Sequence, residues 1–267
     1  LKRMAQDFGY DATVTNCHND YGCLGVWGPN ARATLEKIVD DPSSISLENY
    51  PFAAVKDIVI NGITYMGFRI SYVGEQGWEI HFAMEDGLAL WDALYAQGVT
   101  PVGIETYANS RRLEKSLRLQ NADILTEYNL LEVDLARKVV KKADFHGKEA
   151  YVAQRELEQQ SAYLCTLTMN NNIDSSGVAR YPVGNCPILD PATGEALIDD
   201  KGRRSYTTSI VYGPSIGKNI ALGYLPNEYC EKGRQLEIEY FGDIYAVTVE
   251  AVGYGALYDP DNGKPRS

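Results

Sequence analysis

The side chain of this sequence best placed for binding chemistry is the carboxylate of Glu79. Trp78, Ile80 and Phe82 alternate with Glu79 and His81, which is the period-two pattern of a strand with one apolar face. Glu79 is therefore expected to point away from that apolar face. Through its two oxygens, a carboxylate in this position can accept hydrogen bonds from a ring N–H and an adjacent exocyclic amine of a heterocycle at once.

The residues before Glu79 predict a hairpin. Phe68 and Ile70 alternate with polar residues, and residues 74–77, Gly-Glu-Gln-Gly, form a tight segment between two strands. The same alternation puts Tyr72 on the face of Phe68 and Ile70, not on that of Glu79. Taken alone, Glu79 is typical of an exposed strand glutamate, and Tyr72 of a half-buried strand aromatic.

Other chemistry-bearing residues form weaker patterns. The three histidines and five cysteines have no metal-ligand spacing and include no Cys-x-x-Cys pair, so the sequence predicts neither a metal site nor a disulfide framework. The glycine-bounded residues 213–217 lack the spacing of a phosphate-binding loop and are interpreted as a hairpin turn. The residues considered for metal binding are His18, His81, His146, Cys17, Cys23, Cys165, Cys186 and Cys230.

The composition excludes several classes of partner. The chain has 267 residues, 45% of them hydrophobic, which is enough for one large or two modest domains. Its net charge of -11 argues against nucleic acid or an anionic membrane as a partner, because both need a basic surface. The scattered cysteines favour a reducing compartment, and no apolar run is long enough to span a bilayer or act as an export signal. A cytoplasmic protein is expected.

Alternation and helical spacing predict the elements of the first half. Pro29 is expected at the first position of a helix that continues through Ile38, and the turn Asn61-Gly62 predicts a hairpin with residues 55–60 as its first strand. Residues 88–95 have helical spacing, with Trp91 in the core and Gly98 closing the helix.

Two further helices and a change of period follow. Residues 103–119 and 147–157 have helical patterns, and Glu114, within a run of charges, is interpreted as an ion-paired structural residue. Beyond the polar stretch 158–161 the period becomes two: residues 236–240 and 244–249 are predicted strands joined by a Gly242-Asp243 turn. We therefore expect domains at 1–158 and 159–267, the second a small antiparallel barrel.

Several motifs occur in an order that resembles the folate-binding aminomethyltransferase family. They are the Glu79 hairpin, Gly28-Pro29-Asn30-Ala31, Arg112-Leu113-Glu114-Lys115, Asp123-Ile124-Leu125-Thr126-Glu127, Leu131-Glu132, residues 144–150, Thr208-Ser209 and residues 213–224. The resemblance implies an α+β fold of cloverleaf folate-binding transferase lobes with a C-terminal antiparallel β-barrel. It also implies that Tyr72 and Glu79 lie in a tetrahydrofolate pocket, with Glu79 binding the pterin.

Within that family, Asn109-Ser110 resembles the folate domains of dimethylglycine and sarcosine oxidising enzymes and related demethylases. Asn109 therefore joins Tyr72 and Glu79 as a predicted cofactor-binding residue, whereas Ala108 fills the position of a folate-contacting arginine in the glycine-cleavage protein. The aspartate that acts on the one-carbon donor in relatives is expected to lie outside this chain, in an N-terminal part of the family domain, so no catalytic residue is assigned. A flavoprotein partner chain or domain is a further expectation from the resemblance.

The function that the resemblance implies is tetrahydrofolate-dependent one-carbon transfer, with a methylated amine or similar small molecule as donor. The alternatives are a glycine-cleavage aminomethyltransferase, which Ala108-Asn109 disfavours, and a non-catalytic folate-binding scaffold. The scaffold is ranked below both, because residues 145–148 lack the cysteine motif of the iron-sulfur assembly relatives.

Overall fold

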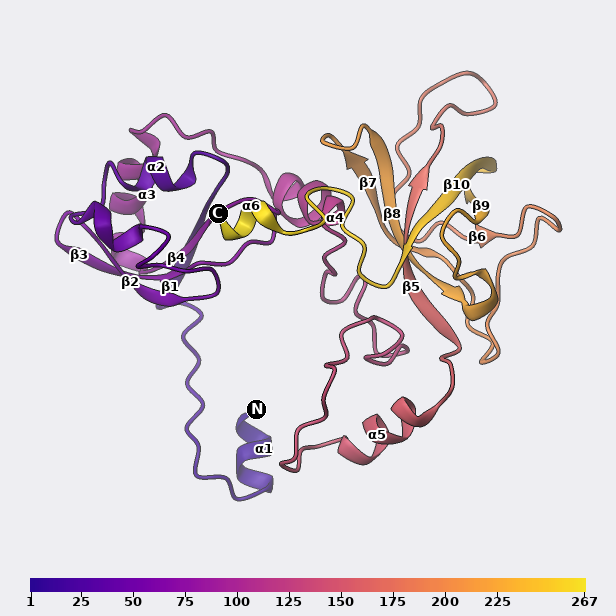
Figure 1. Ribbon diagram of the computed structural model, residues 1–267, viewed down its shortest axis with the longest axis horizontal. Helices are drawn as coiled ribbons and strands as arrows, with labels where there is room; N and C mark the ends of the chain where they lie inside the picture. The colour runs from indigo at the N-terminus through magenta and orange to yellow at the C-terminus, as the bar shows by residue number, and fades with distance from the viewer. The chain divides into compact units, whose positions relative to one another are not determined.

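The computed structural model describes residues 1–267, which divide into two compact units. The first unit comprises residues 1–71, 75–101 and 264–267, and the second comprises residues 72–74 and 102–263 (Figure 1). The predicted domain division at residues 158 and 159 stays a prediction. No helix in the structure has both the length and the apolar character needed to cross a membrane.

The first unit is built on a four-stranded antiparallel sheet with the strand order β1-β4-β3-β2. Its strands are β1 (Tyr21–Trp27), β2 (Val55–Ile60), β3 (Ile63–Phe68) and β4 (Gly77–Ala83). Its helices are α1 (Lys2–Asp7), α2 (Ala31–Leu35), η1 (Pro42–Ile45), η2 (Met84–Asp86) and α3 (Gly87–Tyr95). The short helix α6 (Gly263–Arg266) lies near the C-terminus. One face of the sheet packs with α2 and α3 around the fully buried Trp78 and Ile80.

The Asn61-Gly62 hairpin is confirmed. β2 pairs with β3 from Val55↔Phe68 to Ile60↔Ile63, and both turn residues have positive φ angles, 51° and 74°. Two central residues with positive φ define the type I′ turn, whose twist matches that of the flanking strands. The helix predicted from Pro29 through Ile38 is shorter at both ends, because α2 begins at Ala31, with Asn30 at its N-cap, and ends at Leu35.

Trp91 was wrongly predicted to be a core residue. In α3 the buried side chains are Leu90 and Leu94, whereas Trp91 is 41% exposed and stacks on Tyr95 with ring centroids 6.3 Å apart. Helical spacing correctly indicated that α3 has an apolar face. The residues that pack against the sheet are Leu90 and Leu94, and Trp91 lies to one side of them.

The hairpin before Glu79 also differs from the prediction. β3 ends at Phe68 and β4 begins at Gly77, so the connection is the whole of residues 69–76 and not a tight segment at 74–77. Tyr72 therefore lies in an irregular connection, where the strand alternation used to place it does not apply. The pairing Phe68↔Glu79 nevertheless makes β3 and β4 antiparallel neighbours.

The long segment of the second unit, residues 102–263, starts with a helix that contains a π-helical stretch. η3 (Thr106–Arg111) runs directly into α4 (Arg112–Glu114), and the helix predicted to reach residue 119 ends there. Ser116 just beyond it has a φ of 54°, a left-handed conformation that no helix interior contains. The helix predicted at residues 147–157 is confirmed as α5 (Lys148–Glu156).

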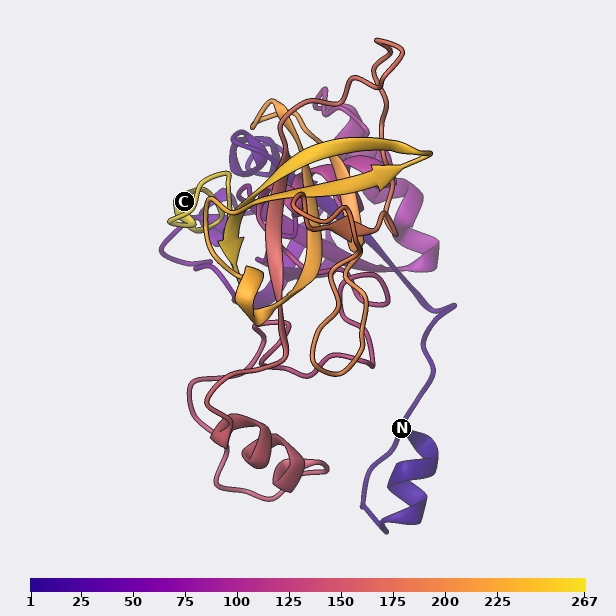
Figure 2. The ribbon, with the colours of Figure 1, turned by 90° about the vertical axis from the view of Figure 1, so that its right-hand side faces the viewer.

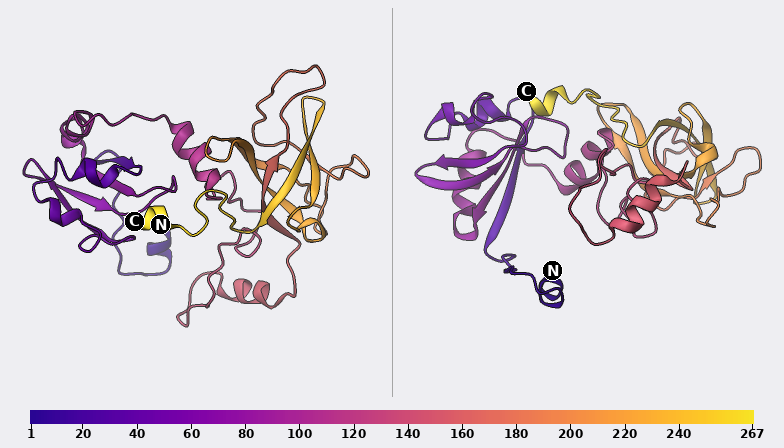
Figure 3. Two further views of the ribbon diagram at one scale, coloured as in Figure 1. Left: turned by 45° about the horizontal axis from the view of Figure 1, so that its top comes forward. Right: turned by 60° about the horizontal axis from the view of Figure 1, so that its bottom comes forward.

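The remaining strands form a six-stranded antiparallel sheet that curls into a barrel with the order β6-β9-β10-β5-β8-β7 (Figure 2). They are β5 (Ala162–Met169), β6 (Ile188–Leu189), β7 (Thr207–Gly213), β8 (Lys218–Pro226), β9 (Gln235–Tyr240) and β10 (Asp243–Val252), with the short helix η4 (Asn227–Tyr229) after β8. A bridge between Pro187 and Tyr206 joins the two ends of the sheet. Figure 3 shows the same curled sheet from two further directions.

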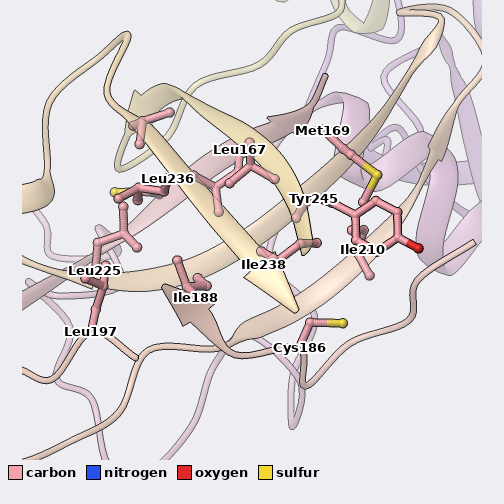
Figure 4. Packing of buried hydrophobic residues seen from close by; sticks show 14 residues of the cluster. Leu167, Met169, Cys186, Ile188, Leu197, Ile210, Leu225, Leu236, Ile238 and Tyr245 are labelled. Atoms are coloured by element: carbon pink, nitrogen blue, oxygen red, sulfur yellow. The ribbon is translucent and has the colours of Figure 1, made fainter. Parts of the chain in front are cut away.

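The barrel interior contains a single cluster of buried side chains. Leu167 of β5 and Leu236 and Ile238 of β9 are at most 1% exposed and pack against one another (Figure 4). Val247 of β10 belongs to the same cluster and is fully buried. The predicted strands at 236–240 and 244–249 and the α+β class with a C-terminal antiparallel barrel are confirmed. The turn between β9 and β10 is Phe241-Gly242, one residue earlier than predicted.

Candidate functional site

Glu79 lies in β4 on the face opposite the core, as predicted. Its neighbours Trp78 and Ile80 are fully buried, whereas the Glu79 side chain is 21% exposed. The Nε2 atom of His81, two residues along the same strand, lies 3.9 Å from the Glu79 Oε2 atom. The carboxylate is therefore accessible and has no lysine or arginine partner.

The sequence did not predict that Cys23 and Phe68, on the two strands beside β4, lie next to Glu79 and His81. Cys23 in β1 is paired in register with His81, and the Cys23 thiol has a pKa raised to about 11, first by burial and then by the charge of Glu79. The ring of Phe68 in β3 meets the His81 ring edge-on, with centroids 4.7 Å apart. The pairing of β1 with β4 brings together residues more than fifty positions apart, and nothing in the local sequence around either strand indicates that register.

Tyr72 belongs to the second unit and is bonded within it. Its hydroxyl donates a hydrogen bond to the backbone oxygen of Arg118 at 2.8 Å, and its ring lies 5.4 Å from that of Tyr107. Burial raises the pKa of Tyr72, while the charge of Arg112 acts in the opposite direction. The phenol is therefore a neutral hydrogen-bonding group at physiological pH.

Asn109 lies in the π-helix η3. Its side-chain nitrogen donates to the Glu105 Oε2 atom at 2.7 Å, one helical turn earlier. Tyr107, which contacts Tyr72, belongs to the same π-helix, so the structure brings Tyr72 to the helix that carries Asn109. Glu79 belongs to the first unit, and its place in a shared pocket with these two residues stays a prediction.

The family motifs of the second unit converge on one buried carboxylate. Asp123 accepts hydrogen bonds from Arg112 and, through its other oxygen, from Ser209 at 2.7 Å and Thr208. Its backbone oxygen accepts from the Tyr224 hydroxyl at 2.6 Å. Arg112 and Asp123 are fully buried, so this network is structural: a buried charge pair needs such additional hydrogen bonds to offset its desolvation.

Glu114 has the structural role predicted for it. The fully buried carboxylate pairs with Arg111 at 2.6 Å and accepts from the backbone N–H of Ser215 at 2.6 Å. These contacts connect the helix end to the turn between β7 and β8.

Residues 213–217, Gly-Pro-Ser-Ile-Gly, have the Gly-x-Ser-x-Gly spacing of a nucleophile elbow. The segment joins the antiparallel strands β7 and β8, however, and not a strand to a helix. The Ser215 hydroxyl accepts a hydrogen bond from Arg111, a cation that cannot serve as a general base. The hairpin-turn interpretation is confirmed.

The second unit also has a surface cleft of about 490 Å³. It contains none of the predicted site residues. Its lining is Ala179, Arg180, Tyr181, Tyr240, Phe241, Asp243 and Tyr245.

An antiparallel sheet with helices on one face, followed by a curled antiparallel barrel, makes this an α+β protein, and the comparisons with known proteins identify the type. In the solved structures, the aminomethyltransferase T of the glycine cleavage system from Bartonella henselae superposes with a TM-score of 0.70 at 23% identity, over 89% of this chain and 60% of that one. The family model for the GCVT N-terminal domain matches residues 1–143, and the model for the glycine cleavage T-protein C-terminal barrel domain matches residues 184–253. The chain therefore belongs to the glycine cleavage T-protein family, whose members bind tetrahydrofolate.

Curated relatives of two kinds are similar to the chain. Human mitochondrial dimethylglycine dehydrogenase is 32% identical over 255 residues, which cover 93% of this chain and 27% of that protein. The aminomethyltransferase of Listeria welshimeri is 33% identical over 240 residues, which cover 88% of this chain and 60% of that protein. The chain thus spans less than two thirds of the length of either relative.

Proposed function

We propose that the chain is the folate-binding part of a tetrahydrofolate-dependent transferase that moves a one-carbon unit from a methylated amine or similar small donor to folate. The observation that carries the proposal is the state of Glu79: a strand carboxylate turned away from the core, partly exposed, with no lysine or arginine partner. The reduced pterin ring offers a ring N–H beside an exocyclic amine, which the two oxygens of such a carboxylate can accept together.

Tyr72 and Asn109 would complete the folate site. The Tyr72 hydroxyl is already anchored on the Arg118 backbone and the Asn109 amide on Glu105, which leaves the tyrosine ring face and the amide oxygen for the ligand. Positioning of folate against the donor is the main contribution we propose for these residues, since correct orientation alone can lower a barrier by about 7–11 kcal/mol.

The proposed function has two versions, which differ in the molecule that donates the one-carbon unit. Similarity to dimethylglycine dehydrogenase favours a one-carbon unit released when a flavoprotein partner or domain oxidises an N-methyl group. Similarity to the Listeria enzyme favours an aminomethyl donor instead, at about the same level of identity. The side chain at position 108 is alanine, so an arginine contact to folate is not available there in either version.

All five cysteines are free thiols, which favours a reducing compartment and supports a cytoplasmic location.

Calorimetric titration of tetrahydrofolate into the purified chain tests the proposal. We expect saturable binding that weakens about 10- to 150-fold in Glu79→Gln, since a hydrogen bond to a charged group contributes about 1.5–3 kcal/mol. Glu237→Gln is the matched control: Glu237 is also a half-buried strand glutamate, in β9 of the barrel, and should leave folate binding unchanged.

Equal affinities for the parent and Glu79→Gln would overturn the role of Glu79. If the parent does bind, incubation with tetrahydrofolate and either an aminomethyl donor or an N-methylated amine with its oxidising flavoenzyme separates the two versions. The version whose donor yields methylene-tetrahydrofolate above the rate without protein is the correct one.

A further inference from the structure

The open face of the first sheet brings together three side chains that bind metals. Cys23 in β1 is directly opposite His81 in β4, and Glu79 lies two residues before His81 on the same face. One donor atom from each, a thiol sulfur, a carboxylate oxygen and an imidazole nitrogen, lies within 4.8 Å of the other two. In a β-sheet, side chains on one face come close together when their residues lie opposite each other on neighbouring strands. Residues two apart on one strand also share a face.

The charge around this cluster favours a cation. Glu79 has no lysine or arginine partner, and its contact with His81 is 3.9 Å, longer than a direct hydrogen bond. A cation bound between these side chains would be paired with the charge of Glu79.

The His81 ring is already oriented. Its edge-on contact with Phe68, at 4.7 Å and an interplanar angle of 60°, restricts rotation of the imidazole. Phe68 comes from β3, which pairs with β4 at Met66↔His81 and Phe68↔Glu79, so three neighbouring strands determine the geometry of the cluster. Ligands carried by strands are positioned more precisely than ligands carried by loops.

We propose that Cys23, Glu79 and His81 bind one divalent cation of the zinc type, with a fourth coordination position open to water or a small ligand. A thiolate and an imidazole select zinc over magnesium and calcium, which take oxygen ligands. Zinc bonds of about 2.0–2.3 Å in tetrahedral geometry put the donor atoms about 3.4–3.6 Å apart. Side-chain rotations that bring the donors together by about 1 Å are sufficient, and the backbone can stay in place.

Cobalt(II) titration of the full chain under reducing conditions tests this site, because cobalt replaces zinc and reports a bound thiolate by its charge-transfer absorption. We expect one equivalent to bind with that absorption, and zinc to displace it. Cys23→Ser should lose the thiolate absorption, and His81→Gln should lose tight binding. Cys17→Ser, at another exposed cysteine, and His146→Gln are the matched controls and should behave as the parent does.

Absence of stoichiometric cobalt binding would overturn the proposal, and so would thiolate absorption that survives in Cys23→Ser. Circular dichroism of each variant checks the fold, and His81→Gln gives an independent result if Cys23→Ser unfolds.

Glu79 also belongs to the proposed folate site, so, where that proposal holds, zinc and tetrahydrofolate compete for one carboxylate. The experiments test the metal site and the folate site independently. Cys23→Ser removes metal binding and should keep folate binding, whereas Glu79→Gln weakens both. A chain that binds cobalt through Cys23 but binds no folate would retain the metal site and lose the proposed function.

Discussion

Asp174 is an example of a carboxylate that several short-range donors hold in its charged form. Its side chain is 2% exposed and accepts hydrogen bonds from Ser176, from the backbone N–H of Val178 at 2.8 Å and from Arg180 at 2.6 Å. These contacts, the Ser176 hydroxyl first, hold the pKa of Asp174 well below its usual range.

A lowered folded-state pKa makes the stabilisation by Asp174 dependent on pH. The stabilisation is fully present above the unfolded-state pKa of about 3.9 and is lost as the pH falls through the folded-state value. We therefore expect Asp174→Asn to lower the urea midpoint at neutral pH, and the difference from the parent to shrink below about pH 4. Asp200→Asn, at an exposed position, is the control. A difference independent of pH would show that the charge of Asp174 is not what stabilises the fold.

The residues around Glu79 show where local sequence patterns stop being informative. Alternation predicted correctly that Glu79 faces away from the core, because that depends only on its neighbours in β4. The approach of Cys23 depends on the register of β1 against β4, and the position of Tyr72 depends on an irregular connection. Neither leaves a periodic signal, so the folate assignment of Tyr72 and Asn109 came only from resemblance to a family.

At the scale of elements, Trp78 and Trp91 of the first unit have opposite roles. Trp78 in β4 is fully buried, and the guanidinium groups of Arg32 and Arg69 lie 5.2 and 5.4 Å from its ring. Trp91 lies on the exposed side of α3.

Alanine substitution should separate these roles. We expect Trp78→Ala to lower the free energy of unfolding by about 3–5 kcal/mol, because it removes a large buried side chain and leaves a cavity. Trp91→Ala should cost less than about 1 kcal/mol, as for most surface substitutions. Urea denaturation followed by far-ultraviolet circular dichroism measures both. Equal losses would mean that Trp91 also supports the core.

Elements with strictly local signals were predicted well. The hairpins β2–β3 and β9–β10 have alternating strands and short turns with positive φ, and both were found within one residue of their predicted turns. The helix expected at 103–119 ended at Glu114, because Glu114 and Lys115 are bound by Ser215 and Asp259, which hold the following chain in another conformation. Those partners lie about a hundred residues or more away in the sequence, so no pattern near the helix indicates its end.

At the scale of the whole molecule, the net charge of -11 acts against an anionic ligand. Tetrahydrofolate carries the carboxylates of its glutamate tail, so long-range repulsion should slow its approach, and salt should reduce that repulsion. We expect the association rate constant to rise a few-fold between about 0.01 M and about 0.3 M salt, as the Debye length falls from about 30 Å to below 10 Å. Stopped-flow fluorescence measures this, with an uncharged reduced pterin lacking the tail as the control. A rate that falls with salt would instead indicate a local basic surface at the entrance to the site.

The bridge between Pro187 and Tyr206 has a consequence for association of the protein with itself. A sheet with a free outer strand presents unpaired N–H and C=O groups that can pair with a strand of another molecule and start aggregation. In the barrel, the bridge joins the two ends of the sheet at one position, just before β7 begins. In the first sheet, the bridge from Val39 meets only Ile60, the last residue of β2, and β1 has no bridge on its outer side. If copies of this chain add to one another strand by strand, β1 presents an outer edge that no bridge interrupts.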